Sequence, residues 1–184
     1  MSIVAIISSP RKNKNSATIV EAMIEGAKKN GKDVKVYHLN SLSHARGCQA
    51  CMGCKAAGKC VIKDDHTEIL DAIREAEGLI VSTPVYFGEA CGQFRLLQDR
   101  FYSFLGPNFV PNIAPGKKCA VVITCGGGEA GAKALADKIE GAMAGMLKFV
   151  PVGKIVYADG NNPEKAAAKN SAVLEEAKAI GKKL

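Results

Sequence analysis

The sequence has no apolar run near the roughly 20 residues that a membrane-spanning helix requires. Its first residues, MSIVAIISSPRK, place no charged segment before the apolar stretch, so they do not resemble a secretory signal. We therefore expect a cytoplasmic protein that does not enter a membrane. Thiols stay reduced in that compartment, so cysteines there indicate metal or redox chemistry rather than a disulfide framework.

The sequence also lacks a concentrated run of basic residues. Lysine and arginine total 25 against 18 acidic residues in 184, which gives a net charge of +7 and a tendency to attract anions. The lysines are dispersed in small pairs, namely Lys28, Lys29, Lys117, Lys118, Lys182 and Lys183. This dispersion is typical of a solvated surface, and we expect no nucleic-acid partner.

Familiar catalytic and nucleotide-binding patterns are missing as well. There is no P-loop, no G-x-G-x-x-G, no Ser-His-Asp arrangement and no convergent pair of carboxylates. The three histidines, His38, His44 and His66, occupy an expected strand, loop and helix start. These absences indicate that cofactors, rather than side chains, supply the chemistry.

What the sequence does contain is an alternation of strands and helices. We expect strands at 2–8, 33–39, 78–83, 119–125 and 149–158, with the second exposed on one side at a sheet edge. Strict alternation forces parallel strands with helices on both faces. The fold class is therefore α/β, a flavodoxin-like doubly wound five-stranded parallel sheet of order 2-1-3-4-5 in one domain, 1–184, with a cysteine-rich loop, 41–64, inserted after strand 2.

Five helices are expected from apolar residues at helical spacing. The first carries Ile19 to Ala27 and stops at Asn30-Gly31, and the second covers about 66–77. The remaining apolar stripes are Phe94, Leu97, Phe101 and Phe104; Leu135, Ile139, Met143 and Met146; and Val173, Ala177 and Ile180. Asn162 and Pro163 are expected to start the closing helix.

Ligands of doubly wound folds bind beyond the carboxyl ends of the strands, so the loops there should carry the binding chemistry. The first loop, SSPRKNKNSAT (8–18), offers hydroxyls, amides and cations before a helix start, which suits a phosphate. A capped helix behind a solvated basic loop is the alternative. Without a P-loop, a mononucleotide fits this loop better than ATP or NAD.

Two later loops suit a flat ring. The segment TPVYFGEACG (83–92) places Pro84, Tyr86 and Phe87 at a strand end, although the aromatics could be core residues. The segment TCGGGEAG (124–131) permits close backbone approach through its glycines, although a plain turn is the alternative. One phosphate loop and two ring loops together favour a flavin mononucleotide.

The segment CQACMGCKAAGKC spaces Cys48, Cys51, Cys54 and Cys60 as C-x2-C-x2-C-x5-C. Consecutive x2 gaps are typical of a 4Fe-4S cluster, whereas zinc sites usually pair two short knuckles across an insert. We favour a cluster over metal-free thiols, a labile disulfide pair, or zinc. The remaining cysteines, Cys91, Cys119 and Cys125, are expected to be small buried hydrophobic residues.

The motifs SPRKNKNSAT, TPVYFG with DRF downstream, and CQACMGCKAAGKCVIKDD resemble the iron-sulfur flavoproteins, within the NADPH-dependent FMN reductases. The resemblance spans nearly the whole chain and implies FMN and 4Fe-4S as cofactors, with Cys48, Cys51, Cys54 and Cys60 as metal ligands. It implies that FMN is bound by Ser9, Arg11, Asn15, Ser16, Ala17, Pro84, Val85, Tyr86, Phe87, Gly88, Gly126 and Gly127. It also implies a homo-oligomer, a dimer of dimers.

The resemblance further implies a flavin-dependent oxidoreductase that relays electrons from a ferredoxin-like donor through the cluster to FMN. The acceptor would be a small molecule such as oxygen or peroxide. The first alternative is a cluster-free reductase of FMN or quinones that uses NAD(P)H. The second is a flavodoxin-like electron carrier without an acceptor of its own.

Overall fold

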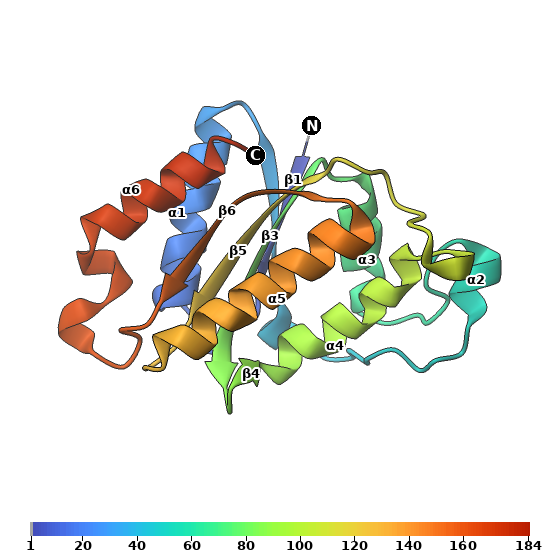
Figure 1. The fold of residues 1–184 in the computed structure, drawn as a ribbon, viewed down its shortest axis with the longest axis horizontal. Helices are drawn as coiled ribbons and strands as arrows, with labels where there is room; N and C mark the ends of the chain where they lie inside the picture. Colours follow the sequence, from blue (N-terminus) through green and yellow to red (C-terminus); the bar gives the residue numbers. More distant parts are fainter. Residues whose placement is uncertain (1) are drawn as a thin grey trace.

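The structure is a computed structural model that describes residues 2–184, without the side chain of Lys165. Its main sheet contains β1 (Ser2–Ile7), β2 (Asp33–His38), β3 (Gly78–Tyr86), β5 (Lys118–Thr124) and β6 (Val150–Tyr157). These five strands are parallel and lie in the order β2-β1-β3-β5-β6, so the expected flavodoxin-like topology is confirmed (Figure 1). A two-residue strand that the sequence did not predict, β4 (Glu89–Ala90), pairs antiparallel with the end of β3.

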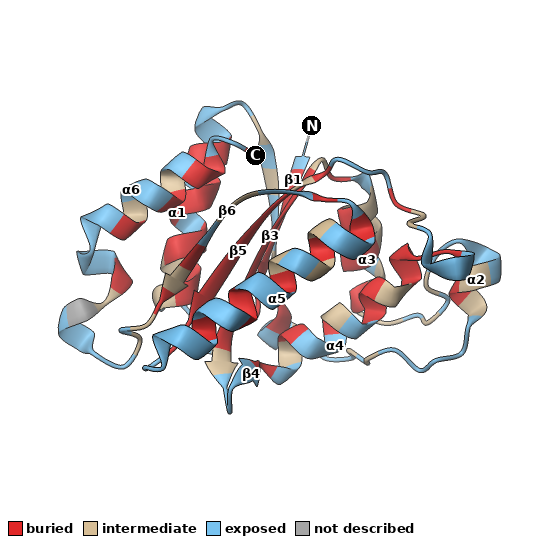
Figure 2. Ribbon diagram, viewed as in Figure 1, coloured by how far each residue is buried: buried red, intermediate tan, exposed pale blue. Residues whose placement is uncertain are grey.

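Helices cover both faces of this sheet. One face carries α1 (Asn15–Lys29) and α6 (Ser171–Gly181), and the other carries α3 (His66–Glu75), α4 (Gly92–Arg100) and α5 (Glu129–Leu147). Figure 2 shows that each of these helices turns a buried stripe toward the strands. Each face therefore has its own apolar core, and the sheet separates the two.

The strands form where the sequence has short apolar runs bounded by turn residues. Residues 3–7 of β1 and 119–123 of β5 are at most 2% exposed, because helices cover both sides of these central strands. β2 pairs with β1 at the end of the strand order, and Val34 and Tyr37 are half-buried while its other four residues are exposed. The expected edge strand is therefore confirmed.

The cysteine-rich segment forms an extension beside the sheet. It follows a 3-10 turn, η1 (Leu39–Ser41), and its only helix among the described residues is α2 (Gly53–Ala57). In Figure 1, α2 lies at one end of the molecule, and α4 runs toward it from the β4 hairpin. The sequence predicted an irregular loop here, and the five-residue helix is the exception.

Some helix boundaries differ from the expectations. Asn162 accepts a hydrogen bond from the N–H of Glu164 and so caps only a 3-10 turn, η4 (Pro163–Lys165). After a second turn, η5 (Ala167–Lys169), the closing helix α6 begins with Asn170 as its N-cap. The prediction of Asn162 and Pro163 as its start was wrong, because two Asn residues satisfy the same capping rule and the second adjoins the apolar stripe.

Two further expectations need correction. α4 ends at Arg100, and the chain continues through Phe101–Phe104 as the 3-10 turn η2 before a third turn, η3 (Pro107–Phe109). Met146 is 50% exposed, although Leu135, Ile139 and Met143 on the same helix are buried as expected. Within residues 2–184, no helix has the length and apolar character needed to cross a bilayer.

Candidate cofactor site

A pocket of about 280 Å³ lies at the carboxyl edge of the sheet, where the loops after β1, β3, β5 and β6 meet. Parallel strands bring their carboxyl ends to one edge, so four loops distant in sequence contribute to one site. The lining residues are Ser9, Arg11, Lys14, Asn15, Ser16, Pro84, Val85, Tyr86, Thr124, Cys125, Gly126, Gly160 and Asn161.

One end of the pocket is suited to an anion. The first turn of α1 has no side-chain cap and no acidic residue, so its free N–H groups and positive dipole end remain unmatched. Arg11 and Lys14 line the pocket beside it. The backbone N–H of Arg11 donates to Ser9 Oγ at 3.2 Å, which shapes the loop. This donor set fits the phosphate of a mononucleotide.

Buried polar contacts hold this end of the pocket in place. Ser16 Oγ and Thr124 Oγ1 lie 2.7 Å apart in a buried hydrogen bond between α1 and the end of β5. Asn15 Oδ1 accepts the backbone N–H of Ala167 at 3.0 Å and so ties the start of α1 to the segment before α6. The hydroxyl and amide groups nearest the helix start are therefore preorganised by contacts across the fold.

The loop after β6 closes a third side. The N–H of Gly160 donates to the carbonyl of Cys125 at 2.8 Å, and a Cβ on Gly160 would overlap that carbonyl. A Cβ on Gly126 would likewise overlap the side-chain amide of Asn161. Glycine is therefore required at Gly160, where the neighbour is backbone, whereas a side chain at Gly126 would displace the Asn161 amide from its place in the pocket.

The end of β3 and its hairpin supply the remaining side. Pro84, Val85 and Tyr86 line the pocket, and they offer apolar surface and backbone groups to a flat ring. Phe87 (φ +53°) and Gly88 (φ +82°) form the left-handed turn into β4. The Phe87 ring is fully exposed, so it points away from the core.

The structure brings together eight of the twelve residues expected to bind FMN. The four that do not line the pocket are Ala17, Phe87, Gly88 and Gly127. Ala17 is buried in the first turn of α1, where only its backbone N–H could face a ligand. The expectation did not include Lys14, Thr124, Cys125, Gly160 and Asn161, which also line the pocket. The signal for Gly160 and Asn161 was the turn directly after the last parallel strand.

The four clustered cysteines lie in the extension, outside this pocket. Cys48 and Cys51 are exposed, Cys60 is half-buried and Cys54 is buried, and all are free thiols. Within residues 2–184, no three His, Cys, Asp or Glu side chains are grouped so that they could hold one metal ion. This arrangement does not distinguish zinc from an iron-sulfur cluster, because both require the thiols to gather. The donor set itself, four thiols on one segment, suits an iron-sulfur cluster, because cluster iron takes cysteine thiolates.

The other three cysteines are buried, as expected. Burial raises the pKa of the Cys119 thiol to about 12, which keeps this thiol protonated and unreactive within β5. Cys91 occupies the N-cap position of α4 without a side-chain cap, and its sulfur donates to the Ser8 carbonyl at 3.4 Å. Cys125 differs from both, because it lines the cofactor pocket.

A family model described as NADPH-dependent FMN reductase matches residues 1–164. The chain belongs to this family. The site geometry agrees with that membership, since the pocket of this FMN reductase relative combines an anion-binding helix start with apolar surface for a ring. The family resemblance seen in the sequence motifs is confirmed.

Named relatives extend the comparison. The chain is 34% identical over 131 residues to an iron-sulfur flavoprotein of Methanosarcina thermophila, a match that covers 71% of this chain and 66% of the relative. It is 35% identical over 100 residues to an iron-sulfur flavoprotein of Methanocaldococcus jannaschii, covering 54% and 51%. The chain thus spans about half to two thirds of the length of these curated relatives.

A solved structure shows the same fold. The NAD(P)H:quinone oxidoreductase from Methanothermobacter marburgensis superposes with a TM-score of 0.72 at 16% identity, over 99% of this chain and 96% of that one. At 16% identity, this match shows that the two chains share a fold. It does not extend to the substrate of this protein.

Proposed function

We propose that this protein is a flavin-dependent oxidoreductase that takes electrons from a ferredoxin-like donor and gives them to a small acceptor such as oxygen or peroxide. FMN would occupy the pocket at the carboxyl edge, and a 4Fe-4S cluster would be held by Cys48, Cys51, Cys54 and Cys60. The observation that carries the proposal is the start of α1, which has no side-chain cap and no acidic residue, at a pocket that Pro84 and Val85 also line. When bound, FMN would supply the redox chemistry of the site.

The residues of the pocket have distinct tasks in this proposal. Arg11, Lys14 and the first N–H groups of α1 would bind the phosphate, with Ser9 and Ser16 adding hydroxyls. The backbone of residues 84–86 and of Gly126 would orient the ring and limit the access of water. The dimer-of-dimers assembly implied by the family resemblance stays a prediction.

A second candidate is a cluster-free reductase that uses NAD(P)H to reduce FMN or quinones. Two observations favour it. The matching family is described as NADPH-dependent FMN reductase, and within residues 2–184 Cys48 and Cys51 are exposed and no three potential metal ligands are grouped. In this case the four cysteines need a role other than cluster binding.

The deciding experiment measures iron, acid-labile sulfide, flavin and visible absorbance on protein purified without oxygen. We expect about four iron and four sulfide per chain, together with one FMN. Cys51→Ser should lose iron and retain FMN. Cys119→Ser, a buried strand residue, is the matched control and should retain both.

Other outcomes favour a different function. FMN without iron, even after anaerobic reconstitution, together with rapid bleaching of the flavin by NADPH, would establish the second candidate. FMN and iron without steady-state consumption of oxygen, peroxide or quinone would indicate an electron carrier. Protein that binds no FMN in vitro would overturn both proposals.

A further inference from the structure

Arg100, the last residue of α4, is a buried cation that the cofactor pocket does not use. Its side chain has 0% exposure and is ion-paired with Asp64, whose side chain is 5% exposed, through Nη1 to Oδ2 at 2.7 Å. A charge this deeply buried needs several hydrogen bonds to offset the loss of water. The hydrogen-bond acceptors of Arg100 therefore show which segments it holds together.

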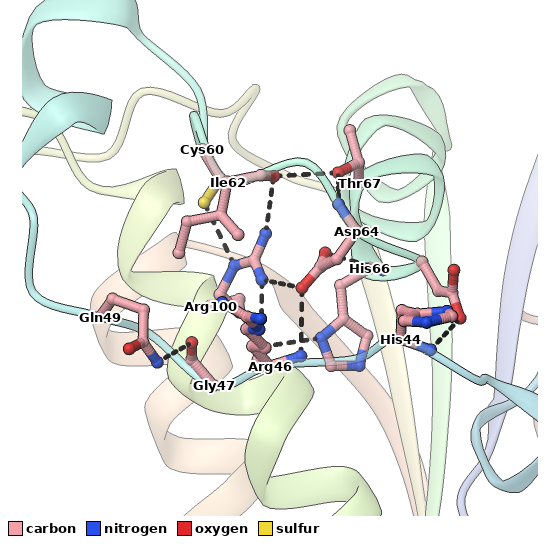
Figure 3. Close-up of polar contacts among 11 residues, drawn as sticks. His44, Arg46, Gly47, Gln49, Cys60, Ile62, Asp64, His66, Thr67 and Arg100 are labelled. Carbon is pink, nitrogen blue, oxygen red and sulfur yellow. Dashed lines mark hydrogen bonds and ion pairs between the residues drawn. The ribbon is translucent and has the colours of Figure 1, made fainter.

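The partners of Arg100 all belong to the cysteine-rich segment or its ends (Figure 3). Nε donates to Cys60 Sγ at 3.2 Å. Nη1 donates to the Arg46 carbonyl at 3.0 Å, and Nη2 donates to the Ile62 carbonyl at 3.2 Å. Arg46 precedes the first clustered cysteine and Ile62 follows the last. We call the residues on these two sides, 43–46 and 62–65, the stems of the segment, and the Arg100 guanidinium bridges them.

Asp64, the ion-pair partner of Arg100, also connects the two stems. Asp64 Oδ2 also accepts the backbone N–H of Arg46 at 3.1 Å, which links the same two stems a second time. The next residue, Asp65, accepts the N–H groups of Ser43 at 2.7 Å and His44 at 2.8 Å. The segment between the stems therefore begins and ends on a buried base built from the KDD and DRF motifs.

We propose that Arg100 is a positioning residue that closes the base of the cysteine segment and orients Cys60 as a cluster ligand. The guanidinium fork suits this task, because it can donate in one plane to a sulfur, a carboxylate and two carbonyls. An N–H bond to a ligand sulfur also stabilises the more negative, reduced state of a cluster. The reduction potential is thus part of the prediction.

The position of Arg100 links the two candidate cofactor regions. α4 begins two residues after β4, whose partner strand β3 ends at the pocket with Tyr86, and α4 ends at Arg100, which bonds to Cys60. Its nine residues span about 13 Å at 1.5 Å per residue. One helix therefore lies in the chain between the hairpin that follows the pocket strand β3 and the residue that contacts Cys60.

The first test measures hydrogen exchange of residues 47–63 in iron-free protein, so it does not depend on the proposed function. Arg100→Lys keeps the charge, but its single nitrogen cannot reach four acceptors. Loss of hydrogen bonds to a charged group should accelerate exchange there about tenfold or more. Arg95→Lys, on the exposed side of α4, is the matched control and should match wild type. Equal exchange in both variants would overturn the proposal.

The second test rests on the proposed function and uses the iron-loaded protein. Arg100→Lys should lower the reduction potential of the cluster relative to wild type and Arg95→Lys, because the bond to Cys60 is lost. A buried pair with a purely structural role would lower the melting temperature and leave the potential unchanged, which would refute the assignment to Cys60. If wild type takes up no iron, the cluster proposal fails, and hydrogen exchange alone decides whether Arg100 closes the segment.

A further variant guards against misfolding of Arg100→Lys. Replacing both members of the pair, in Arg100→Met with Asp64→Leu, removes the buried charges together and leaves no unpaired ion. This double variant should fold and should show the same faster exchange over residues 47–63. Wild-type exchange in a folded double variant would contradict the proposed closure.

Discussion

His66 is a buried imidazole, 1% exposed, whose Nδ1 lies 3.2 Å from the Arg46 carbonyl. Burial lowers its pKa below the usual 6.5, and the nearby Arg100 acts in the same direction. The neighbouring carboxylates of Asp64 and Asp65 and the hydrogen bond with Arg46 raise the pKa but do not outweigh burial. The folded protein therefore keeps this imidazole neutral under conditions where the unfolded chain protonates it.

This difference predicts a pH-dependent stability. Above pH 6.5 the contribution of His66 is complete, and it is lost as the pH falls through 6.5 toward the lower folded pKa. His66→Asn retains a donor for the Arg46 carbonyl but cannot titrate. Urea unfolding of iron-free protein at pH 7.5 and pH 5.5, values bracketing the unfolded pKa of about 6.5, should show a smaller loss of stability in the variant. Identical losses in both proteins would refute the prediction.

At the scale of the element, α1 combines a structural deficit with a binding function. Lys14 occupies the N-cap in an extended conformation (φ −114°, ψ −175°) and makes no side-chain cap. A helix start without a cap is less stable alone but keeps its N–H groups available for an anion. The two requirements conflict at this one position.

Lys14→Asp should separate the two requirements. An aspartate N-cap should stabilise the FMN-free protein by about 1 kcal/mol. The same carboxylate should weaken FMN binding at least tenfold, roughly 1.4 kcal/mol, through repulsion of the phosphate and competition for the N–H groups. Urea unfolding and fluorescence titration with FMN measure the two effects. Lys14→Ala, which removes the cation without adding a cap, is the control and should weaken binding less.

The elements also show how far the sequence could predict this molecule. Apolar runs and helical stripes were sufficient for the five main strands and the helices on both faces, because burial imposes these patterns directly. Contacts between distant segments leave no such pattern. Asn161 lines the pocket through its approach to Gly126, and Arg100 is a buried charge in a segment recognised only by its apolar stripe, which runs from Phe94 to Phe104. The hairpin turn at Phe87 was missed because its left-handed conformation usually favours Gly or Asn.

At the scale of the whole molecule, the net charge of +7 bears on the proposed donor. Arg46, Lys59 and Lys63 are exposed on the segment that carries the clustered cysteines. Lys55 differs, because its Nζ lies 3.5 Å from the centroid of the Tyr102 ring and donates to the Tyr102 carbonyl at 3.0 Å. The positive charge available for steering a partner is therefore that of Arg46, Lys59 and Lys63, which we call the rim of the segment. Lys55 packs inward.

Reduction by an acidic ferredoxin should accordingly be fast at low salt and slow by roughly tenfold at high salt, because screening removes electrostatic steering. Lys59→Glu with Lys63→Glu should reduce both the rate at low salt and its salt dependence. Lys182→Glu with Lys183→Glu is the matched control, since each Lys→Glu change removes one positive and adds one negative charge, and both double variants fall from +7 to +3. Stopped-flow reduction of the flavin measures the rates. If both double variants slow equally, the total charge of the molecule guides the donor, and the rim of the cysteine segment has no special part in docking.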